Sequence, residues 1–228
     1  ERGGADWMRE VHDAGGVFAI AHPFTVGDPA CTGCSWELGL PAPGPGSGVD
    51  AMEICNEWWS APSNDNAMML ALWRRLLTPE GGPTAIAGTD AHGSHAWFPG
   101  APQTWIHADE LSAPGILGGL RRGHAIVTFG PGFAFSALAD GGDTLIPGSH
   151  ASANALTLRA AWRDAPHGAE LRFLRRNEII QSTAVSAAGE ASIDATVDAA
   201  AWFSAELWAL DHTPLAISNP IFVTPRAA

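Results

Sequence analysis

The sequence predicts an α/β fold for residues 1–131 and an antiparallel β fold for residues 132–228. In the first part, short apolar runs alternate with helical patterns, which implies parallel strands, as in an α/β barrel or a doubly wound sheet. In the second part, several alternating apolar runs follow one another at short intervals, which is typical of an antiparallel sandwich or sheet. The pattern changes just after Gly130 and Pro131, and we place a domain boundary there.

The elements expected in the first part follow from the spacing of apolar residues. Helices are expected at residues 5–14, 64–77 and 113–122. Strands are expected at residues 17–21, 51–55, 84–87 and 104–106. The stretch 27–48 is rich in Pro, Gly and Cys, and we expect it to form a long ordered loop over the mouth of an active site.

The second part contains strand patterns at residues 156–162, 170–174, 191–195 and 203–208. Turn-forming residues at 164–168 and 188–189 separate them, so we expect short strands joined by turns.

Charge and hydropathy exclude several classes of function. The chain has 12 basic residues, all of them Arg, against 24 acidic ones, which gives a net charge of −12. Such a chain repels phosphate backbones, so nucleic acid is not an expected partner. It holds no apolar stretch near the roughly 20 residues that span a bilayer, so no membrane span is expected in it. Motifs of serine hydrolases, P-loop proteins and dinucleotide-binding proteins are absent from the sequence.

Candidate metal ligands stand where expected strands end. His22 follows one strand directly, and Asp90 and His92 follow another. The carboxyl ends of strands line the active site of α/β barrels. A carboxylate and two imidazoles converging there suit zinc, manganese or iron. Taken alone, His22 also fits a hydrogen-bonded turn residue, and Asp-Ala-His is a short match.

The motifs, in their order and spacing, resemble those of a known family over nearly the whole chain. Three stretches are similar to the later motifs of the PHP (polymerase and histidinol phosphatase) metallohydrolases: Ile20-Ala21-His22-Pro23, Met52-Glu53-Ile54-Cys55-Asn56 and Gly88-Thr89-Asp90-Ala91-His92-Gly93. Four more are similar to its carbaryl-hydrolase (CehA/McbA-like) branch: Thr104-Trp105-Ile106, Leu120-Arg121-Arg122-Gly123-His124, Val127-Thr128-Phe129-Gly130-Pro131 and Ile217-Ser218-Asn219-Pro220-Ile221-Phe222-Val223.

The resemblance implies a fold and a set of site residues. The fold would be the C-terminal part of a PHP-type distorted β/α barrel, followed by a small antiparallel β-sandwich-like domain. Asp90 would ligate a first metal and His22 a second, whereas His92 would ligate a third metal or contact the substrate. Glu53 and Asn56 would support the site without being ligands.

The sequence departs from the family at its beginning. PHP proteins carry an early His-x-His pair, a bridging Glu and a further His before the motif that His22 matches, and only 21 residues precede His22 here. The resemblance therefore implies the C-terminal part of a longer metallohydrolase that holds two ions. We expect little or no activity from this part alone.

Three further residues are candidates for roles near the site. His95 follows the Asp90–His92 turn, and it either shapes a substrate pocket or belongs to a solvated loop. Cys31 and Cys34 form a CxxC that fits half of a zinc site, a disulfide or a redox pair, and a loop staple or simple packing is favoured. A CxxC in an acidic chain without Lys favours an exported or periplasmic location over the cytoplasm.

Two functions from different classes remain open. The first is a metal-dependent hydrolase, in which metal-bound hydroxide attacks a phosphoester, or a carbamate or other acyl ester, of a small-molecule substrate. The alternative is a non-catalytic remnant whose β-domain serves binding or assembly. The sequence leaves the oligomeric state open.

Overall fold

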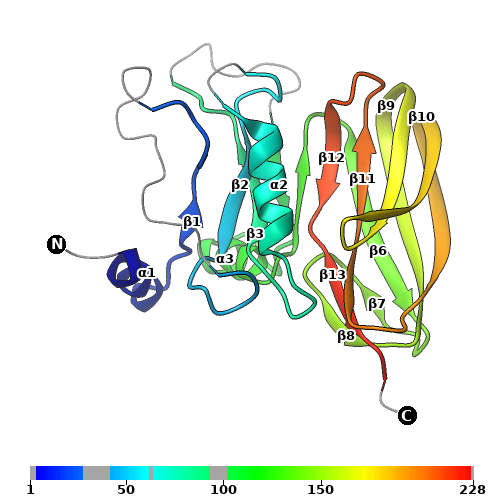
Figure 1. The fold of residues 1–228 in the computed structure, drawn as a ribbon, viewed down its shortest axis with the longest axis horizontal. Helices are drawn as coiled ribbons and strands as arrows, with labels where there is room; N and C mark the ends of the chain where they lie inside the picture. Colours follow the sequence, from blue (N-terminus) through cyan, green and yellow to red (C-terminus); the bar gives the residue numbers. More distant parts are fainter. Residues whose placement is uncertain (1–3, 28–41, 62–63, 93–101, 227–228) are drawn as a thin grey trace.

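Two β-sheets lying side by side make up most of this computed structural model (Figure 1). The structure describes residues 4–27, 42–61, 64–92 and 102–226. Strands hold 48% of the described residues and helices 15%. One sheet has three parallel strands, and the other has ten strands that curl into a half-barrel. The fold is therefore mostly β.

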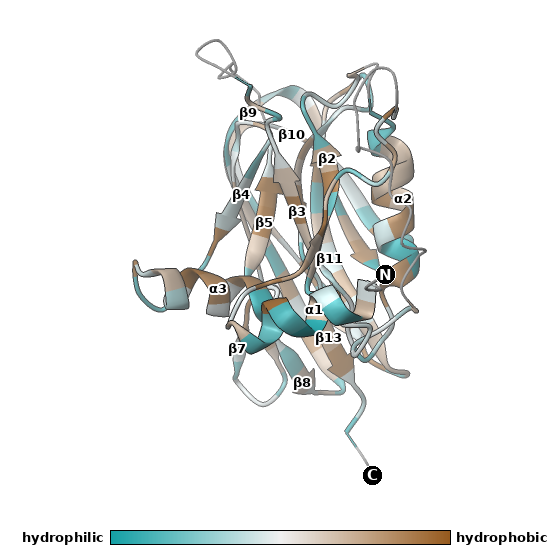
Figure 2. Cartoon of the chain, turned by 90° about the vertical axis from the view of Figure 1, so that its left-hand side faces the viewer, coloured by the Kyte–Doolittle hydropathy of each residue, from teal (hydrophilic) through white to brown (hydrophobic). Residues whose placement is uncertain are grey.

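The small sheet has the strand order β1-β2-β3 and is parallel throughout. Its strands are β1 (Ala19–Ile20), β2 (Ala51–Asn56) and β3 (Thr84–Gly88). Helix α1 (Gly4–Asp13) precedes it, and α2 (Asn66–Leu76) connects β2 to β3 and packs on β2. Five of the six residues of β2 are buried, as expected for a strand covered on both faces. Helix α1 buries none of its residues and presents a mainly hydrophilic side (Figure 2).

Two of the three helices begin where the sequence supplies a capping side chain. The carboxylate of Asp65 accepts a hydrogen bond from the backbone N–H of Met68 at 2.9 Å, which caps α2. The hydroxyl of Ser112 does the same for Gly115 at 3.1 Å, which caps α3 (Ala113–Arg121). All three helices expected from the sequence are therefore confirmed.

The large sheet runs in the order β4-β5-β12-β11-β9-β6-β7, with β10 paired to β9, and with β13 paired to β11 and β8. It is antiparallel apart from the β8–β13 pair. Aromatic and aliphatic side chains such as Phe133, Leu158 and Phe203 fill its interior. The strands are β4 (Gln103–Ile106), β5 (Ala125–Thr128), β6 (Gly132–Ala139), β7 (Thr144–Leu145), β8 (His150–Ser152), β9 (Ala155–Arg175), β10 (Glu178–Thr196), β11 (Ala201–Trp208), β12 (Pro214–Ser218) and β13 (Ile221–Thr224).

The predicted α/β fold class, with part of a β/α barrel, is wrong. Only β1, β2 and β3 pair in parallel, whereas β4 and β5 pair antiparallel with each other across α3 and join the large sheet through β12. A helix can connect two parallel or two antiparallel strands. The alternation of strand and helix patterns in the sequence therefore does not determine the direction in which the strands pair. Strands on both sides of Pro131 belong to the large sheet, and the domain boundary there stays a prediction.

The predicted sandwich of short strands is also wrong. Strand β9 runs for 21 residues through the expected turn at 164–168 and pairs with the 19-residue β10. Asp164 and Gly168 adopt positive φ of 61° and 80°, and the β9–β10 register shifts beside them. These residues thus bend a continuous strand, as bulges do, and help to curl the sheet.

Side chains join the two sheets where strand pairing stops. The amide of Asn219 accepts from the backbone N–H of Ala85 at 2.7 Å and donates to the carbonyls of Ala85 and Ala125 at 3.0 Å each. The hydroxyl of Thr104 accepts from the N–H of Ala87 at 2.9 Å and donates to its carbonyl at 3.0 Å. Both residues thus act in place of a neighbouring strand at the edge of β3.

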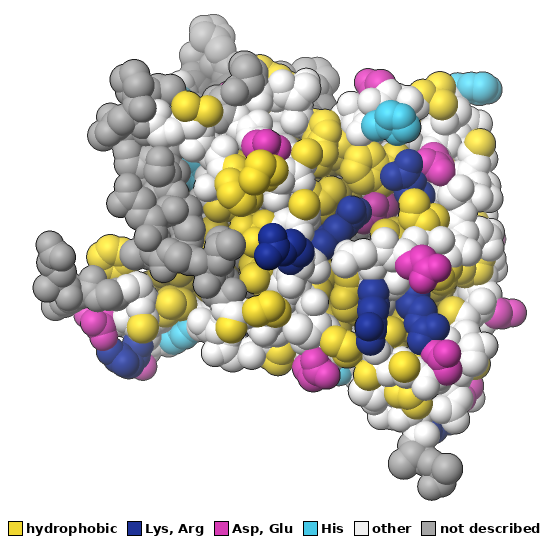
Figure 3. Space-filling model, viewed as in Figure 1, with side chains coloured by type: hydrophobic (Ala, Val, Ile, Leu, Met, Phe, Trp, Pro, Cys, Tyr) yellow, Lys and Arg dark blue, Asp and Glu magenta, His cyan; other side chains and the backbone are white. Residues whose placement is uncertain are grey.

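A buried ion pair connects α2 to the large sheet. Glu206 on β11 is 2% exposed, pairs with Arg74 of α2 and accepts a hydrogen bond from the indole of Trp208 at 2.8 Å. Arginine side chains gather on this face of the molecule, and acidic side chains lie beside several of them (Figure 3). Arg172, for example, pairs with Glu170 and lies 5.0 Å over the ring of Trp208.

Candidate functional site

The carboxyl ends of all three parallel strands share an unusual backbone conformation. His22 after β1, Glu57 after β2 and Asp90 after β3 have positive φ of 30°, 58° and 53°. Residues other than glycine rarely adopt this backbone conformation, because it costs them about 1–3 kcal/mol. Such residues are concentrated at functional sites. Two of the three residues are the metal ligands expected from the sequence. The edge that carries them is the candidate functional site.

His22 lies against the carboxylate of Glu53 on the neighbouring strand. The backbone N–H of His22 donates to Oε2 of Glu53 at 2.6 Å. The ring nitrogen Nδ1 lies 3.4 Å from the same oxygen, and it is buried and makes no well-directed hydrogen bond. This second contact is a charge contact, because its direction is unsuitable for a hydrogen bond.

The surrounding charges favour the protonated form of His22. The Glu53 carboxylate beside the ring raises the pKa of His22 above its ordinary value, while burial lowers it less strongly. The charge of Asp90 also raises this pKa, so the ends of β1 and β3 are close enough to interact. The expected proximity of His22, Glu53 and Asp90 thus agrees with the electrostatics of this edge.

Asp90 and His92 form a second pair at the end of β3. Nε2 of His92 lies 2.8 Å from Oδ1 of Asp90. The His92 side chain is 85% exposed, whereas that of Asp90 is 33% exposed. His92 therefore lies on the solvent side of Asp90. His95 falls outside the described residues, as do Cys31 and Cys34.

A glycine makes room for the Glu53 carboxylate. A Cβ atom on Gly88 would lie 2.8 Å from Oε1 of Glu53 and 3.8 Å from Oδ1 of Asn56. Asn56 is 3% exposed, and its Nδ2 atom is buried with no hydrogen-bond partner among the described residues. The two expected supporting residues therefore lie beside each other over Gly88, and a buried amide donor is left free there.

Sequence reasoning missed the residue that shapes the end of β2. Asn66, at the start of α2, is 1% exposed and accepts from the N–H of Asn56 at 3.0 Å. Its Nδ2 donates to the carbonyls of Asn56, Trp58 and Trp59 at 3.0–3.2 Å. These bonds hold the turn that contains Glu57. An Asn at a helix start is a capping signal, but its contacts back to the strand end have no sequence signature.

The described residues fit a metal site only in part. His22 and Asp90 supply nitrogen and oxygen ligands of the types that bind zinc, manganese or iron. Glu53 is placed to orient the His22 ring, as carboxylates beside metal-binding histidines do. Within residues 4–27, 42–61, 64–92 and 102–226, however, the His, Cys, Asp and Glu side chains form no group of three close enough to enclose an ion.

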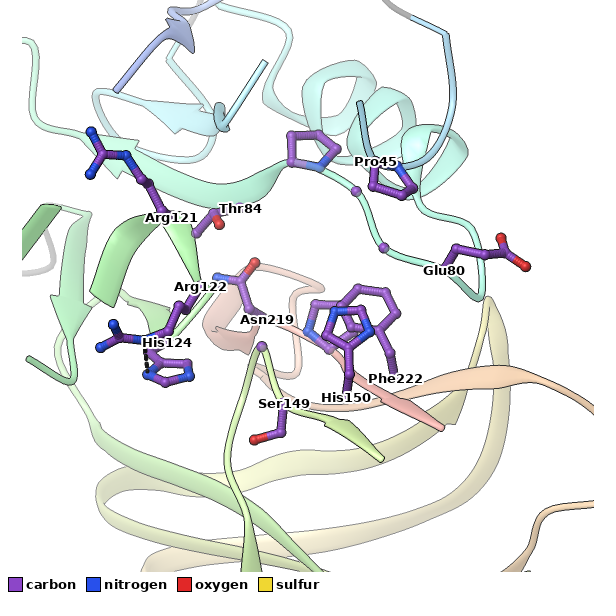
Figure 4. Close-up of a pocket in the computed structure, with 16 residues that line it drawn as sticks. Pro45, Glu80, Thr84, Arg121, Arg122, His124, Ser149, His150, Asn219 and Phe222 are labelled. Atoms are coloured by element: carbon purple, nitrogen blue, oxygen red, sulfur yellow. Dashed lines mark hydrogen bonds between the residues drawn. The ribbon is translucent and has the colours of Figure 1, made fainter. Parts of the chain in front are cut away.

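A different pocket opens at the opposite, amino end of β3. It has a volume of about 420 Å³ and lies between Thr84 and residues of the large sheet (Figure 4). The guanidinium groups of Arg121 and Arg122 point away from its centre, and Arg122 donates to Asp109 at 2.8 Å. The amide of Asn219 is occupied by the backbone of both sheets. The polar groups of this pocket thus hold the fold together.

In comparisons with protein-family models and with curated proteins, nothing matches this chain. The assignment of the site therefore rests on its residues and geometry. In the part of the chain that the structure describes, the helices have 9 to 11 residues, and none has the length and apolar character needed to cross a membrane.

Proposed function

We propose that the carboxyl edge of the small sheet is part of the active site of a metal-dependent hydrolase. The observation that carries this proposal is the contact of His22 with Glu53 at the edge where Asp90 also ends a strand, with strained backbone at His22 and Asp90. The resemblance of the same residues to motifs of the PHP metallohydrolases supports it.

Each residue has a distinct role in this proposal. His22 and Asp90 hold a divalent transition metal. Glu53 holds its negative charge beside Nδ1 of the His22 ring, so that Nε2 is the nitrogen left for the metal. His92 beside Asp90 is placed to bind the substrate or a further ion. The metal supplies Lewis acidity, which polarises an ester and lowers the pKa of water.

The substrate class is an ester that such a site activates. A phosphoester is the commoner substrate of the family that the motifs resemble, and a carbamate or acyl ester is that of the carbaryl-hydrolase branch. The net charge of −12 favours small substrates over nucleic acid. We retain both ester classes, because the same ligands serve either.

Metal binding tests the proposal directly. Zinc and manganese affinity is measured by isothermal titration calorimetry for the chain and for its Asp90→Ala and His22→Ala variants. We expect each variant to bind at least about tenfold more weakly, because each loses a ligand. Hydrolysis of p-nitrophenyl phosphate and of an aryl N-methylcarbamate is then measured in the presence of the metal.

Asp109→Ala is the matched control, because Asp109 is 72% exposed and pairs with Arg122 away from the site. Metal affinity that is equal in Asp90→Ala, His22→Ala and the control would contradict the proposal. That result would favour the alternative, a non-catalytic chain.

A further inference from the structure

A groove crosses the outer face of the large sheet, on β6 and β9. Two adjoining hollows of about 670 and 290 Å³ share Ala134 and Ala161. These two residues face each other across the strands, because Ala134 pairs with Ala161. Trp105 and Arg163 line one end of the groove, and Arg159 lines the other.

The floor of the groove consists of small side chains. Residues of β9 alternate here, so that Leu158 and Ala160 are buried while Ala161 is exposed. On β6, Ala134 and Ser136 lie between the buried Phe133, Phe135 and Ala137. A flat ligand can therefore lie on these small residues, beside Glu190 of β10, which pairs with Ala161 and also lines the groove.

Two arginines with free guanidinium groups stand on the same face. Arg159 and Arg163 are four residues apart on β9, a separation of about 13 Å along an extended strand. Within the described residues, neither forms an ion pair or a hydrogen bond, whereas Arg74, Arg172 and Arg175 all pair with carboxylates. Glu190 lines the same groove, so its lining carries two guanidinium groups and one carboxylate. This net positive charge, on a chain of net charge −12, favours an anionic ligand.

Gly132 and Trp105 define the Arg163 end of the groove. A Cβ on Gly132 would lie 2.4–2.9 Å from side-chain atoms of Arg163, so the arginine stem lies across the glycine. Trp105 is 38% exposed, and its indole N–H donates to Gln103 at 3.1 Å, which holds the ring. An aromatic ring that is fixed and half-exposed offers a stacking surface to a ligand ring.

We propose that this groove binds an acidic oligosaccharide, such as one built from uronic acids. Its sugar rings would pack on the small-residue floor and on Trp105, and two of its carboxylates would meet Arg159 and Arg163. Ser136 and Ser192 line the groove and would bond sugar hydroxyls. An acidic peptide would satisfy the arginines, but it would not need the aromatic ring. This site is independent of the proposed hydrolytic site.

Calorimetry with oligogalacturonate tests this proposal on the full chain. We expect binding that the double variant Arg159→Gln/Arg163→Gln weakens at least about tenfold, because it loses two charge-assisted contacts. Trp105→Ala should weaken it about fivefold. Arg75→Gln is the control for the loss of a positive charge, since Arg75 is an exposed residue of α2 that does not line the groove. Circular dichroism verifies that every variant is folded.

Three results would overturn the proposal. The first is the absence of oligogalacturonate binding to the unmodified chain. The second is equal binding by the double variant and by Arg75→Gln. The third is tighter binding of polyglutamate than of oligogalacturonate with no effect of Trp105→Ala, which would assign the groove to acidic peptides instead.

Discussion

At the scale of single residues, the missing side chain of Gly88 is as important as the side chains around it. The space that a Cβ atom would fill at this residue is occupied by the carboxylate of Glu53, which in turn contacts His22. Any side chain at residue 88 would enter this space. The surroundings of His22, which follows β1, therefore depend on a glycine in β3, two strands away in the small sheet.

Gly88→Ala should weaken zinc binding about tenfold, because the added methyl displaces the carboxylate that orients His22. Titration calorimetry of the variant against the unmodified chain measures this. Gly118→Ala is the control, since its Cβ would meet only the mobile end of Arg122, at 3.3 Å. Unchanged zinc affinity in Gly88→Ala would show that Glu53 does not position the ligand.

Residue types at strand ends were predictable, but backbone conformation was not. His22, Asp90 and Glu53 stood out because imidazole and carboxylate groups after apolar runs carry chemistry. The positive φ of Glu57 has no sequence signal, since any residue type can be forced into it by its surroundings. The space over Gly88 also depends on a neighbouring strand whose register the sequence did not reveal.

At the scale of elements, Asn219 and Thr104 replace a strand. Edge strands usually leave backbone groups unpaired, but the N–H and carbonyl groups of Ala85 and Ala87 meet side chains of the large sheet. Ala85 and Ala87 are two residues apart, and in a strand every second residue presents its backbone groups to the same neighbouring strand. Side chains thus continue the small sheet into the large one.

Asn219→Ala should lower the free energy of unfolding by about 3 kcal/mol, because it leaves the buried N–H and carbonyl groups of Ala85 without their partner. Urea denaturation followed by circular dichroism measures the change. Asn154→Ala serves as the control, since the side chain of Asn154 accepts one exposed hydrogen bond, from the N–H of Arg226. A loss in Asn219→Ala no larger than in the control would rule out this role.

The errors of sequence analysis at this scale have one physical origin. Local patterns located the helices well, but strand direction depends on contacts between distant residues. Strand β5, for example, pairs with β12, which lies about 90 residues later in the chain. Similarly, the residues at 164–168 have turn chemistry, yet pairing with β6, β10 and β11 keeps β9 continuous.

At the scale of the whole molecule, one of the two hydrophobic clusters contains residues of both sheets. Residues of α2 and β2 pack with Val127, Trp202 and Ile217 of the large sheet. The buried pair of Arg74 and Glu206 crosses the same boundary. The sheets should therefore unfold together.

Glu206→Gln should lower the free energy of unfolding by about 3 kcal/mol, because the carboxylate removed is 2% exposed and is the counter-charge of the partly exposed Arg74. Hydrogen exchange should show the same loss in β2 and in β11. Glu170→Gln is the matched control, since Glu170 is 35% exposed, and it should change stability by less than about 1 kcal/mol. Exchange that accelerates in β11 alone would mean that the sheets are energetically separate.

Because the side chain of Asn219 binds the backbone of β3, the hydrogen bonding of β3 is completed late during synthesis of the chain. Residues 84–88 leave the ribosome more than a hundred residues before Asn219 does. Until then, the backbone groups of Ala85 that Asn219 will bind lack their partner, and β12, which precedes Asn219, is missing from the large sheet. The nascent chain thus carries an open strand edge until Asn219 has been made, and β3 reaches its final hydrogen bonding only after β12 has appeared.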